Sequence, residues 1–142
     1  MSIARLVIAV VLGLVVGSLV NMALVLVSGH VIPPPAGADM TTPEGIRAAL
    51  PQLEARHFVF PFLAHALGTL AGAFVAARIA SGRRLTAALI VGVFFFAGGV
   101  MAAWMIPAPA GFIALDLIAA YFPFAWLGSR MARPRQAGAH AG

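Results

Sequence analysis

The sequence predicts an all-α integral membrane protein, a bundle of four transmembrane helices with a short amphipathic helix between the first and the second. The first observation is composition: the 142 residues are 62% hydrophobic and 9% charged, which leaves too few polar side chains to cover a surface in water. The mean hydropathy of +1.01 agrees. The second observation is the presence of four apolar segments, and the third is the gathering of arginines on one side of them.

The four segments run from about residue 6 to 28, 57 to 80, 85 to 106 and 111 to 129. Each is close to the roughly 20 residues that cross a ~30 Å hydrocarbon core. We expect residues 1 to 132 to form one domain and residues 133 to 142 to be a disordered tail. Residues 1 to 38 could also be read as a cleaved signal peptide, but their apolar run exceeds the ~7 to 15 residues of a secretory core, so we favour a retained helix.

The distribution of charge predicts the orientation. Positive residues beside short loops stay in the cytoplasm, and one side of the segments carries Arg5, Arg78, Arg83, Arg84, Arg130, Arg133 and Arg135. We therefore expect both termini in the cytoplasm and a location in a bacterial inner membrane. The net charge of +5 is then a topology signal that also suits anionic lipid, and nucleic acid is not an expected partner. The absence of cysteine excludes disulfides and thiolate chemistry.

The loop from residue 29 to 56 contains a predicted helix. Thr41 or Thr42 can cap it, and Pro43 and Glu44 suit its first turn. Apolar side chains then recur at helical spacing, at Ile46, Ala49, Leu50 and Leu53. We interpret this as an amphipathic helix on the membrane interface, and the alternative is a lid over an outward-facing cavity.

Small residues at every fourth position predict close helix packing, because helices in lipid associate by close approach of their backbones. The packing glycines we expect are Gly13, Gly17, Gly68, Gly72, Gly98 and Gly99. These stripes also leave room for a homo-oligomer. Pro61 and Pro123 lack an N–H group, so each is expected to kink its helix.

A few strongly polar residues lie inside the segments. Counting from the segment ends puts Asn21, His65 and Asp116 at one depth, roughly 8 to 14 Å below the outer boundary. An ionised aspartate at mid-membrane costs about 2.5 to 3.5 kcal/mol and normally faces a partner inside the bundle. We expect His65 to contact Asp116, with Asn21 and Thr69 adjacent. Both a structural clamp and a functional site, such as a proton relay, a path for a polar solute or a headgroup site, remain open.

No catalytic motif is found, so an enzyme is the less favoured reading. His57 and His65 are about 12 Å apart along a helix, too far to share a metal ion whose ligands lie ~2.1 Å away. A haem would need His65 with a methionine as second ligand, such as Met22, Met101 or Met105, and we expect no cofactor. Tyr121 and Trp126 are interpreted as interface or packing aromatics.

Three stretches carry a resemblance: PFLAHALGTLAGA at 61 to 73, PAP at 107 to 109 and DLIAAYFPFAWLG at 116 to 128. With them, most of the chain except the tail resembles a group of small bacterial inner-membrane proteins with four segments. The resemblance implies the topology and no activity. For function, we favour a small oligomeric bundle in the lipid bilayer with a buried, outward-leaning polar site for protons or a small solute, in transport or sensing. The alternative is a non-catalytic accessory or assembly subunit of a larger membrane complex.

Overall fold

The computed structural model describes residues 1 to 133, and the regular secondary structure of this part of the chain consists of helices, with no strand. It contains four helices long and apolar enough to cross a membrane: α1 (Ile3–Val31), α3 (Val59–Ile79), α4 (Arg84–Met105) and a fourth span, Ala110–Met131. The fold class predicted from the sequence is therefore confirmed. The predicted tail lies outside the described residues except for Arg133.

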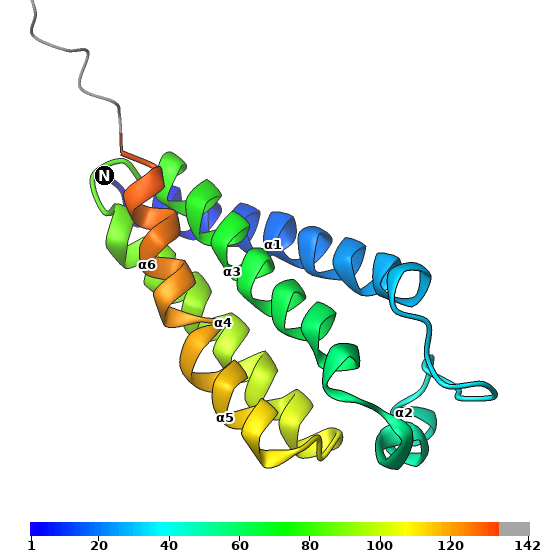
Figure 1. Cartoon of the computed structure of the whole chain (residues 1–142). Coiled ribbons are helices and arrows are strands. Elements are labelled where there is room, and N and C mark those ends of the chain that lie inside the picture. The colour runs from blue at the N-terminus through cyan, green and yellow to red at the C-terminus, as the bar shows by residue number, and fades with distance from the viewer. Residues whose placement is uncertain (134–142) are drawn as a thin grey trace, which may run out of the picture.

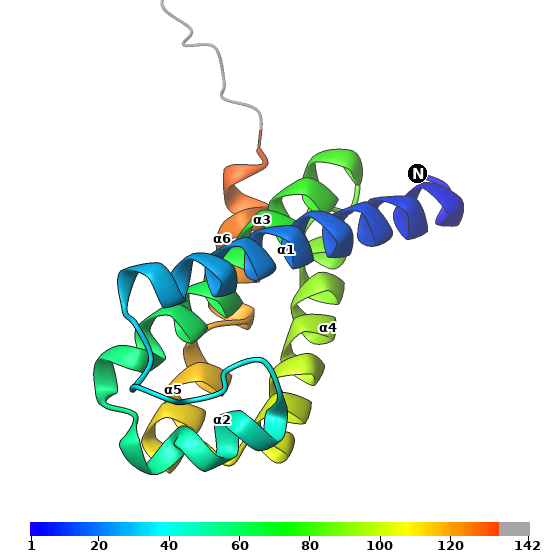
Figure 2. The same ribbon diagram turned by 90° about the vertical axis from the view of Figure 1, so that its right-hand side faces the viewer.

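Helix α3 lies at the centre of the bundle. It packs against α1 on one side and against α4 and the C-terminal half of the fourth span on the other (Figures 1 and 2). Successive spans run in opposite directions, so α1 begins and the fourth span ends at the same end of the bundle. Arg5 ties two elements together there, because its Nε donates to the carbonyl of Ile79 at the end of α3, 3.0 Å away.

Four of the predicted packing glycines form the contact between α1 and α3. A Cβ on Gly17 would lie 2.6 Å from the carbonyl oxygen of Gly68, and a Cβ on Gly72 would lie 2.6 Å from that of Gly13. No real side chain tolerates such distances, so the two backbones touch only because these positions are glycine. The close approach replaces the hydrophobic attraction that lipid cannot supply.

Gly98 does not pack within the described part of the chain, because a Cβ there would meet nothing within 4 Å and the residue is exposed, so helix packing at Gly98 stays a prediction. Neighbouring positions on a helix point about 100° apart, so Gly98 and Gly99 cannot both face the same partner. Gly99 is the buried one of the two.

The two prolines act differently. Pro123 cannot donate to the carbonyl of Ala119, and the fourth span breaks there into α5 (Ala110–Ala119) and α6 (Phe122–Met131). Pro61 lies in the first turn of α3, where a missing N–H removes no intrahelical bond. The kink predicted at Pro61 is thus replaced by a junction between a 3₁₀ turn, η2 (Ala55–Phe58), and α3.

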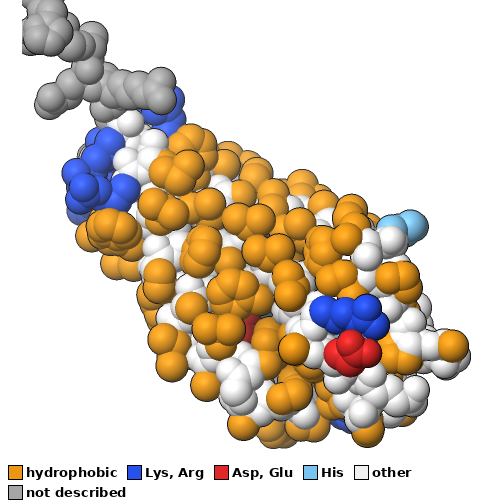
Figure 3. All heavy atoms as spheres, viewed as in Figure 1, with side chains coloured by type: hydrophobic (Ala, Val, Ile, Leu, Met, Phe, Trp, Pro, Cys, Tyr) orange, Lys and Arg blue, Asp and Glu red, His pale blue; other side chains and the backbone are white. Residues whose placement is uncertain are grey.

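The face of the bundle drawn in Figure 3 is apolar between two ends that carry charged side chains. Large apolar side chains on α1 are not covered by other parts of the described chain, among them Ile8, Val11, Val15, Leu19 and Leu26. A surface of this kind is stable only against an apolar solvent. The four apolar helices and this surface fit an integral membrane protein.

The predicted short helix is present as α2 (Pro43–Ala49), followed by a 3₁₀ turn, η1 (Leu50–Gln52). Of the two candidate caps, Thr42 is the one used: its hydroxyl accepts from the N–H of Gly45 at 3.0 Å. Arg47 anchors α2 to the bundle by donating from Nε to the carbonyl of Met105 at the end of α4. Ile46 and Leu50 point to a cavity inside the bundle, so the apolar face of α2 covers protein, as the lid alternative requires.

Asp39 holds the residues just before α2 in place by hydrogen bonds, and the stability of this segment should therefore depend on pH. Its carboxylate accepts from the hydroxyl of Thr41 at 2.6 Å, from the N–H of Thr41 at 2.8 Å and from the hydroxyl of Thr42 at 3.2 Å. These bonds, the Thr41 hydroxyl first, hold the pKa of Asp39 below its ordinary value of 3.8. A carboxyl with a lowered pKa stabilises the fold above its unfolded pKa and loses that contribution as the pH falls through its folded pKa.

We therefore expect the start of α2 to loosen as the pH falls below 3.8. The measurement is hydrogen exchange at the amides of Thr41 and Gly45, expressed as protection relative to the unfolded chain at each pH. In Asp39→Asn the side-chain oxygen still accepts hydrogen bonds but does not titrate, so its protection should not change over the same range. A wild-type protein with equally flat protection would contradict the prediction.

Candidate functional site

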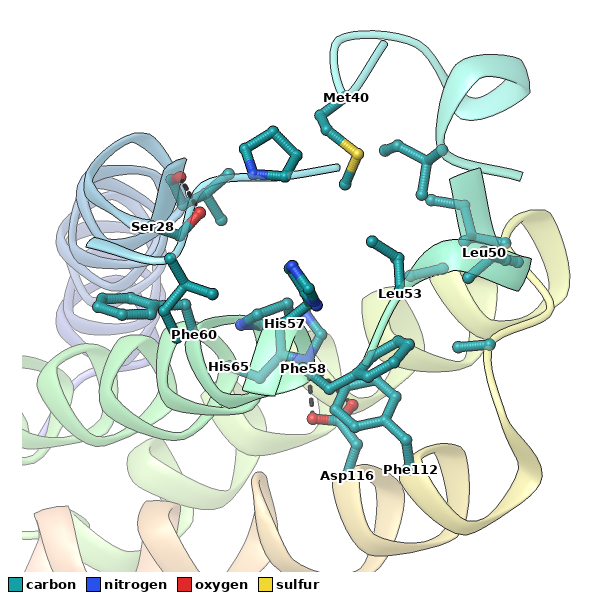
Figure 4. A pocket seen from close by; sticks show the side chains of 18 of the residues that line it. Ser28, Met40, Leu50, Leu53, His57, Phe58, Phe60, His65, Phe112 and Asp116 are labelled. Atoms are coloured by element: carbon teal, nitrogen blue, oxygen red, sulfur yellow. Dashed lines mark hydrogen bonds and ion pairs between the residues drawn. The ribbon is translucent and has the colours of Figure 1, made fainter. Parts of the chain in front are cut away.

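The structure brings His65 of α3 and Asp116 of α5 together. The Nδ1 atom of His65 lies 2.9 Å from both carboxylate oxygens of Asp116 (Figure 4). Asp116 is 4% exposed, whereas the side chain of His65 is 26% exposed. The contact expected from the sequence is therefore made, with the carboxylate enclosed and the imidazole only partly enclosed.

Tyr121 is a third member of this cluster. Its hydroxyl donates to Oδ2 of Asp116 at 2.7 Å and lies 3.0 Å from Nδ1 of His65, and the residue is 1% exposed. In a continuous helix, residues five apart point about 140° from each other. The break before α6 removes this constraint and turns Tyr121 back toward Asp116. The interpretation of Tyr121 as only an interface or packing aromatic is wrong. The sequence signal for its role is Pro123, because this proline marks the helix break that turns Tyr121 toward Asp116.

Gly99 of α4 makes room for Tyr121. A Cβ on Gly99 would lie 3.0 Å from Cε2 of the Tyr121 ring and closer still to its hydroxyl. We expect Gly99→Ala to push the ring away, to break the bond to Asp116 and to lower the free energy of unfolding by about 1 to 3 kcal/mol. Thermal unfolding in a mild detergent, followed by circular dichroism, measures the loss.

Gly98→Ala is the matched control, because it adds the same methyl group at the next position, into open space. It should be neutral or slightly stabilising, since alanine favours helices over glycine by up to ~1 kcal/mol. Equal effects of the two substitutions would contradict a specific role for Gly99.

The other two predicted members are near the pair without joining it. Thr69 is fully buried, and its hydroxyl donates to the carbonyl of His65 at 2.7 Å, one turn back along α3. Asn21 packs beside Gly68, where a Cβ would lie 3.0 Å from the Cβ of Asn21. The Oδ1 atom of Asn21 is buried and has no hydrogen-bond partner among residues 1 to 133. No hydrogen bond joins the side chain of Asn21 to His65 or Asp116 among these residues.

The pair borders a cavity of about 610 Å³ at the end of the bundle that carries α2. Its walls come from the end of α1, from α2 and η2, from the start of α3, from the end of α4 and from α5. Figure 4 shows His65 and Asp116 facing each other, with Phe58 and Phe112 beside them and Leu50 and Leu53 across the space. Most lining side chains are apolar, and the polar ones are Ser28, His30, His57, His65 and Asp116.

The hydrogen bonds define what the pair can do chemically. With Nδ1 against a carboxylate, the imidazole carries its proton on Nδ1, a tautomer inferred from the bond. The other ring nitrogen, Nε2, has no hydrogen-bond partner within the described part of the chain, and it is not a fully enclosed atom. His65 can therefore accept a proton or a hydrogen bond at Nε2, while Asp116 balances the charge that a proton brings.

Among residues 1 to 133, no three histidine, aspartate or glutamate side chains gather closely enough to hold a metal ion. The candidate site is thus the hydrogen-bonded cluster of His65, Asp116 and Tyr121 and the cavity that it borders. Comparisons of the chain with protein-family models, with curated proteins and with solved structures found no match, so the function is argued from this geometry.

Proposed function

We propose that this chain is a non-catalytic membrane protein that exchanges protons or a small solute at His65 and Asp116, in transport or sensing. The observation that carries the proposal is the position of the pair at the border of a cavity of about 610 Å³, with no hydrogen-bond partner for Nε2 of His65 among residues 1 to 133. Ionisable residues inside a membrane are costly, and those that border a cavity are typical of ion and solute pathways.

A structural clamp alone would need neither the cavity nor the free nitrogen. Two side chains that only join helices are most stable when every polar atom is bonded and water is excluded. Asp116 meets this condition through His65 and Tyr121, but His65 does not. The partial exposure of its side chain, 26%, supports a role in binding beside the role in packing.

The orientation is part of the proposal. The end of the bundle where α1 begins and α6 ends carries Arg5, Arg78, Arg83, Arg84 and Arg130, which supports cytoplasmic termini in a bacterial inner membrane. The cavity then lies toward the outside. A reporter that is active only in the cytoplasm, fused to residue 142, tests this orientation. An inactive fusion would indicate the opposite orientation.

Titration of His65 tests the exchange of protons. We expect the ¹⁵N signals of His65, in the full chain in lipid, to change with pH over the range in which the chain stays folded, because an exchanging site must populate two protonation states. His30→Gln is the matched control, since it removes an exposed histidine from the same cavity wall. The signals that disappear belong to His30, and the signals of His65 should remain. A His65 signal that stays constant over this range would overturn proton exchange.

The alternative, an accessory subunit, is favoured by one observation. The glycines of α1 and α3 pack against each other within the chain. Gly98, in contrast, lies on an exposed face of α4 with Met101 and Trp104, which are 61% and 85% exposed. That face suits a second copy or a larger complex. Gly98→Leu should then abolish an oligomer or a co-purified partner seen by native mass measurement, and an unchanged assembly would exclude this face.

A further inference from the structure

We propose that the cavity binds an uncharged amphiphile that has an apolar body and one hydroxyl head, with the hydroxyl bonded to Nε2 of His65. This inference rests on the proposed function, because it names the class of solute for the same site. Three features of the cavity carry it: the apolar walls, the lack of a free charge among the described lining residues, and Nε2 of His65, which has no hydrogen-bond partner in the part of the chain that the structure describes.

The walls select an apolar body. Phe58 and Phe112 form one side, with ring centroids 4.9 Å apart and planes at 39°. Ile106, Ile113 and Leu117 continue the apolar surface. The volume of about 610 Å³ lies within the ~300 to 1,000 Å³ of pockets that enclose small organic ligands. Burial of apolar surface is the main attraction that such a pocket offers.

The charges exclude ions as the preferred ligand. No lysine or arginine is among the lining residues, so an anion would find no permanent positive charge. A cation would have to compete for Asp116, whose carboxylate is already bonded by His65 and Tyr121. An ion without a partner in an apolar cavity loses its hydration without compensation, and an uncharged ligand avoids this cost.

The hydrogen bonds identify where the head binds. Ser28 lies near the end of α1 and has only acceptor lone pairs left, because its hydroxyl hydrogen is donated to the carbonyl of Val25 at 2.7 Å. Both ring nitrogens of His57 are occupied: Nδ1 accepts from the N–H of Glu54 at 2.9 Å, and Nε2 lies 3.3 Å from the carbonyl of Pro33. His30 has Nδ1 3.2 Å from the carbonyl of Leu26, and its Nε2, which no described residue bonds, belongs to an exposed side chain at the end of α1 that water can reach. His65 Nε2 is therefore the polar atom beside the Phe58 and Phe112 wall that still needs a partner.

A hydroxyl is the head that fits Nε2 in both of its states. Neutral imidazole presents a lone pair there and needs a donor, whereas protonated imidazole presents an N–H and needs an acceptor. A hydroxyl both donates and accepts, so it stays bonded when His65 gains or loses a proton. An ether or a carbonyl can bond only to the protonated form.

The test compares two probes that differ in one group. Para-hexylphenol and para-hexylanisole have the same ring and chain, but only the phenol has a hydroxyl. We expect the full chain in lipid nanodiscs to bind the phenol roughly fivefold or more tightly than the anisole, measured by calorimetry against empty nanodiscs. Para-hexylbenzoate and hexyltrimethylammonium, an anion and a cation, should bind more weakly than both. Equal binding of phenol and anisole would overturn the proposal.

Variants locate the two parts of the ligand. In His65→Phe the preference for the phenol should disappear while binding of the anisole persists, because a ring remains but Nε2 is gone. Ala102→Phe on α4 fills the cavity and should reduce binding of both probes at least tenfold. Ala97→Phe, on the exposed side of the same helix, should bind as wild type does. Unchanged binding in Ala102→Phe would place the probes elsewhere and overturn the proposal.

The two proposals fail separately. If His65 titrates but the wild-type protein does not prefer the phenol, the ligand class is wrong and proton exchange stands. If the phenol is preferred but the His65 signal never changes with pH, the ligand class stands and proton exchange is wrong. The comparison of probes in wild type decides the inference even if His65→Phe does not fold.

Discussion

Replacing Gly17 with leucine is expected to separate α1 from α3 and to lower the free energy of unfolding by about 3 kcal/mol or more. The Cβ of residue 17 would lie 2.6 Å from the carbonyl oxygen of Gly68 and 2.8 Å from Cζ of Phe95. The backbone oxygen cannot move away without the whole helix, so the substitution exceeds ordinary overpacking of a core. Thermal unfolding in detergent, together with steric trapping in lipid, measures the loss.

Gly29→Leu is the matched control on the same helix, because a Cβ at Gly29 meets nothing within 4 Å. Its stability should stay within about 0.5 kcal/mol of wild type. Gly68→Leu should repeat the loss from the other side, and the double substitution should cost less than the sum, because both break one contact. Similar stability of the Gly17 and Gly29 variants would contradict the α1–α3 interface.

The spans and the α1–α3 contact could be predicted because their signals are local. Length and hydropathy define a membrane span, and a repeat of small residues every four positions defines one helix face. Which side of α4 packs could not be predicted, because Gly98 and Gly99 offer two faces and the sequence does not say where the fourth span lies. Only the position of Tyr121 selects Gly99.

The polar pair was predictable from depth and the rest of the site was not. Counting residues from the membrane boundary gives the height of a side chain but not its direction around the helix. This was enough for His65 and Asp116, which are 2.9 Å apart. Asn21 has a similar predicted height, yet α1 points it at Gly68. Tyr121 required the geometry of a helix break, which Pro123 predicts only as a kink of unknown direction.

The role of α2 shows a further limit. A helix with one apolar face has the same pattern whether that face lies on lipid or on protein. Thr42 and Pro43 define where α2 begins, but they do not select between these neighbours. The bond from Arg47 to the carbonyl of Met105 joins residues that are 58 positions apart, and only the folded chain reveals it.

Asp116 gives the other large expected effect. In Asp116→Leu, the Nδ1–H of His65 and the hydroxyl of Tyr121 both lose their acceptor inside the bundle. Each donor left without an acceptor costs about 1 to 3 kcal/mol, and the cost at His65 is reduced because its side chain is partly exposed, so we expect a total loss of about 2 to 4 kcal/mol in thermal unfolding. Asp116→Asn keeps one oxygen, which at the Oδ2 position can accept from both groups, although its amide NH2 then faces Nδ1 of His65. It should therefore lose less, about 1 to 2 kcal/mol.

The asparagine variant separates a clamp from a site. Without a carboxylate, a proton on His65 has no negative partner at 2.9 Å, so Asp116→Asn should fold but behave differently from wild type in a proton-flux assay. His65→Ala should likewise fold with a smaller loss than Asp116→Leu, because the carboxylate keeps its bond from Tyr121. If Asp116→Asn and His65→Ala both unfold the bundle in mild detergent, the pair is needed mainly to hold α5 to α3, and the case for exchange at this site is lost.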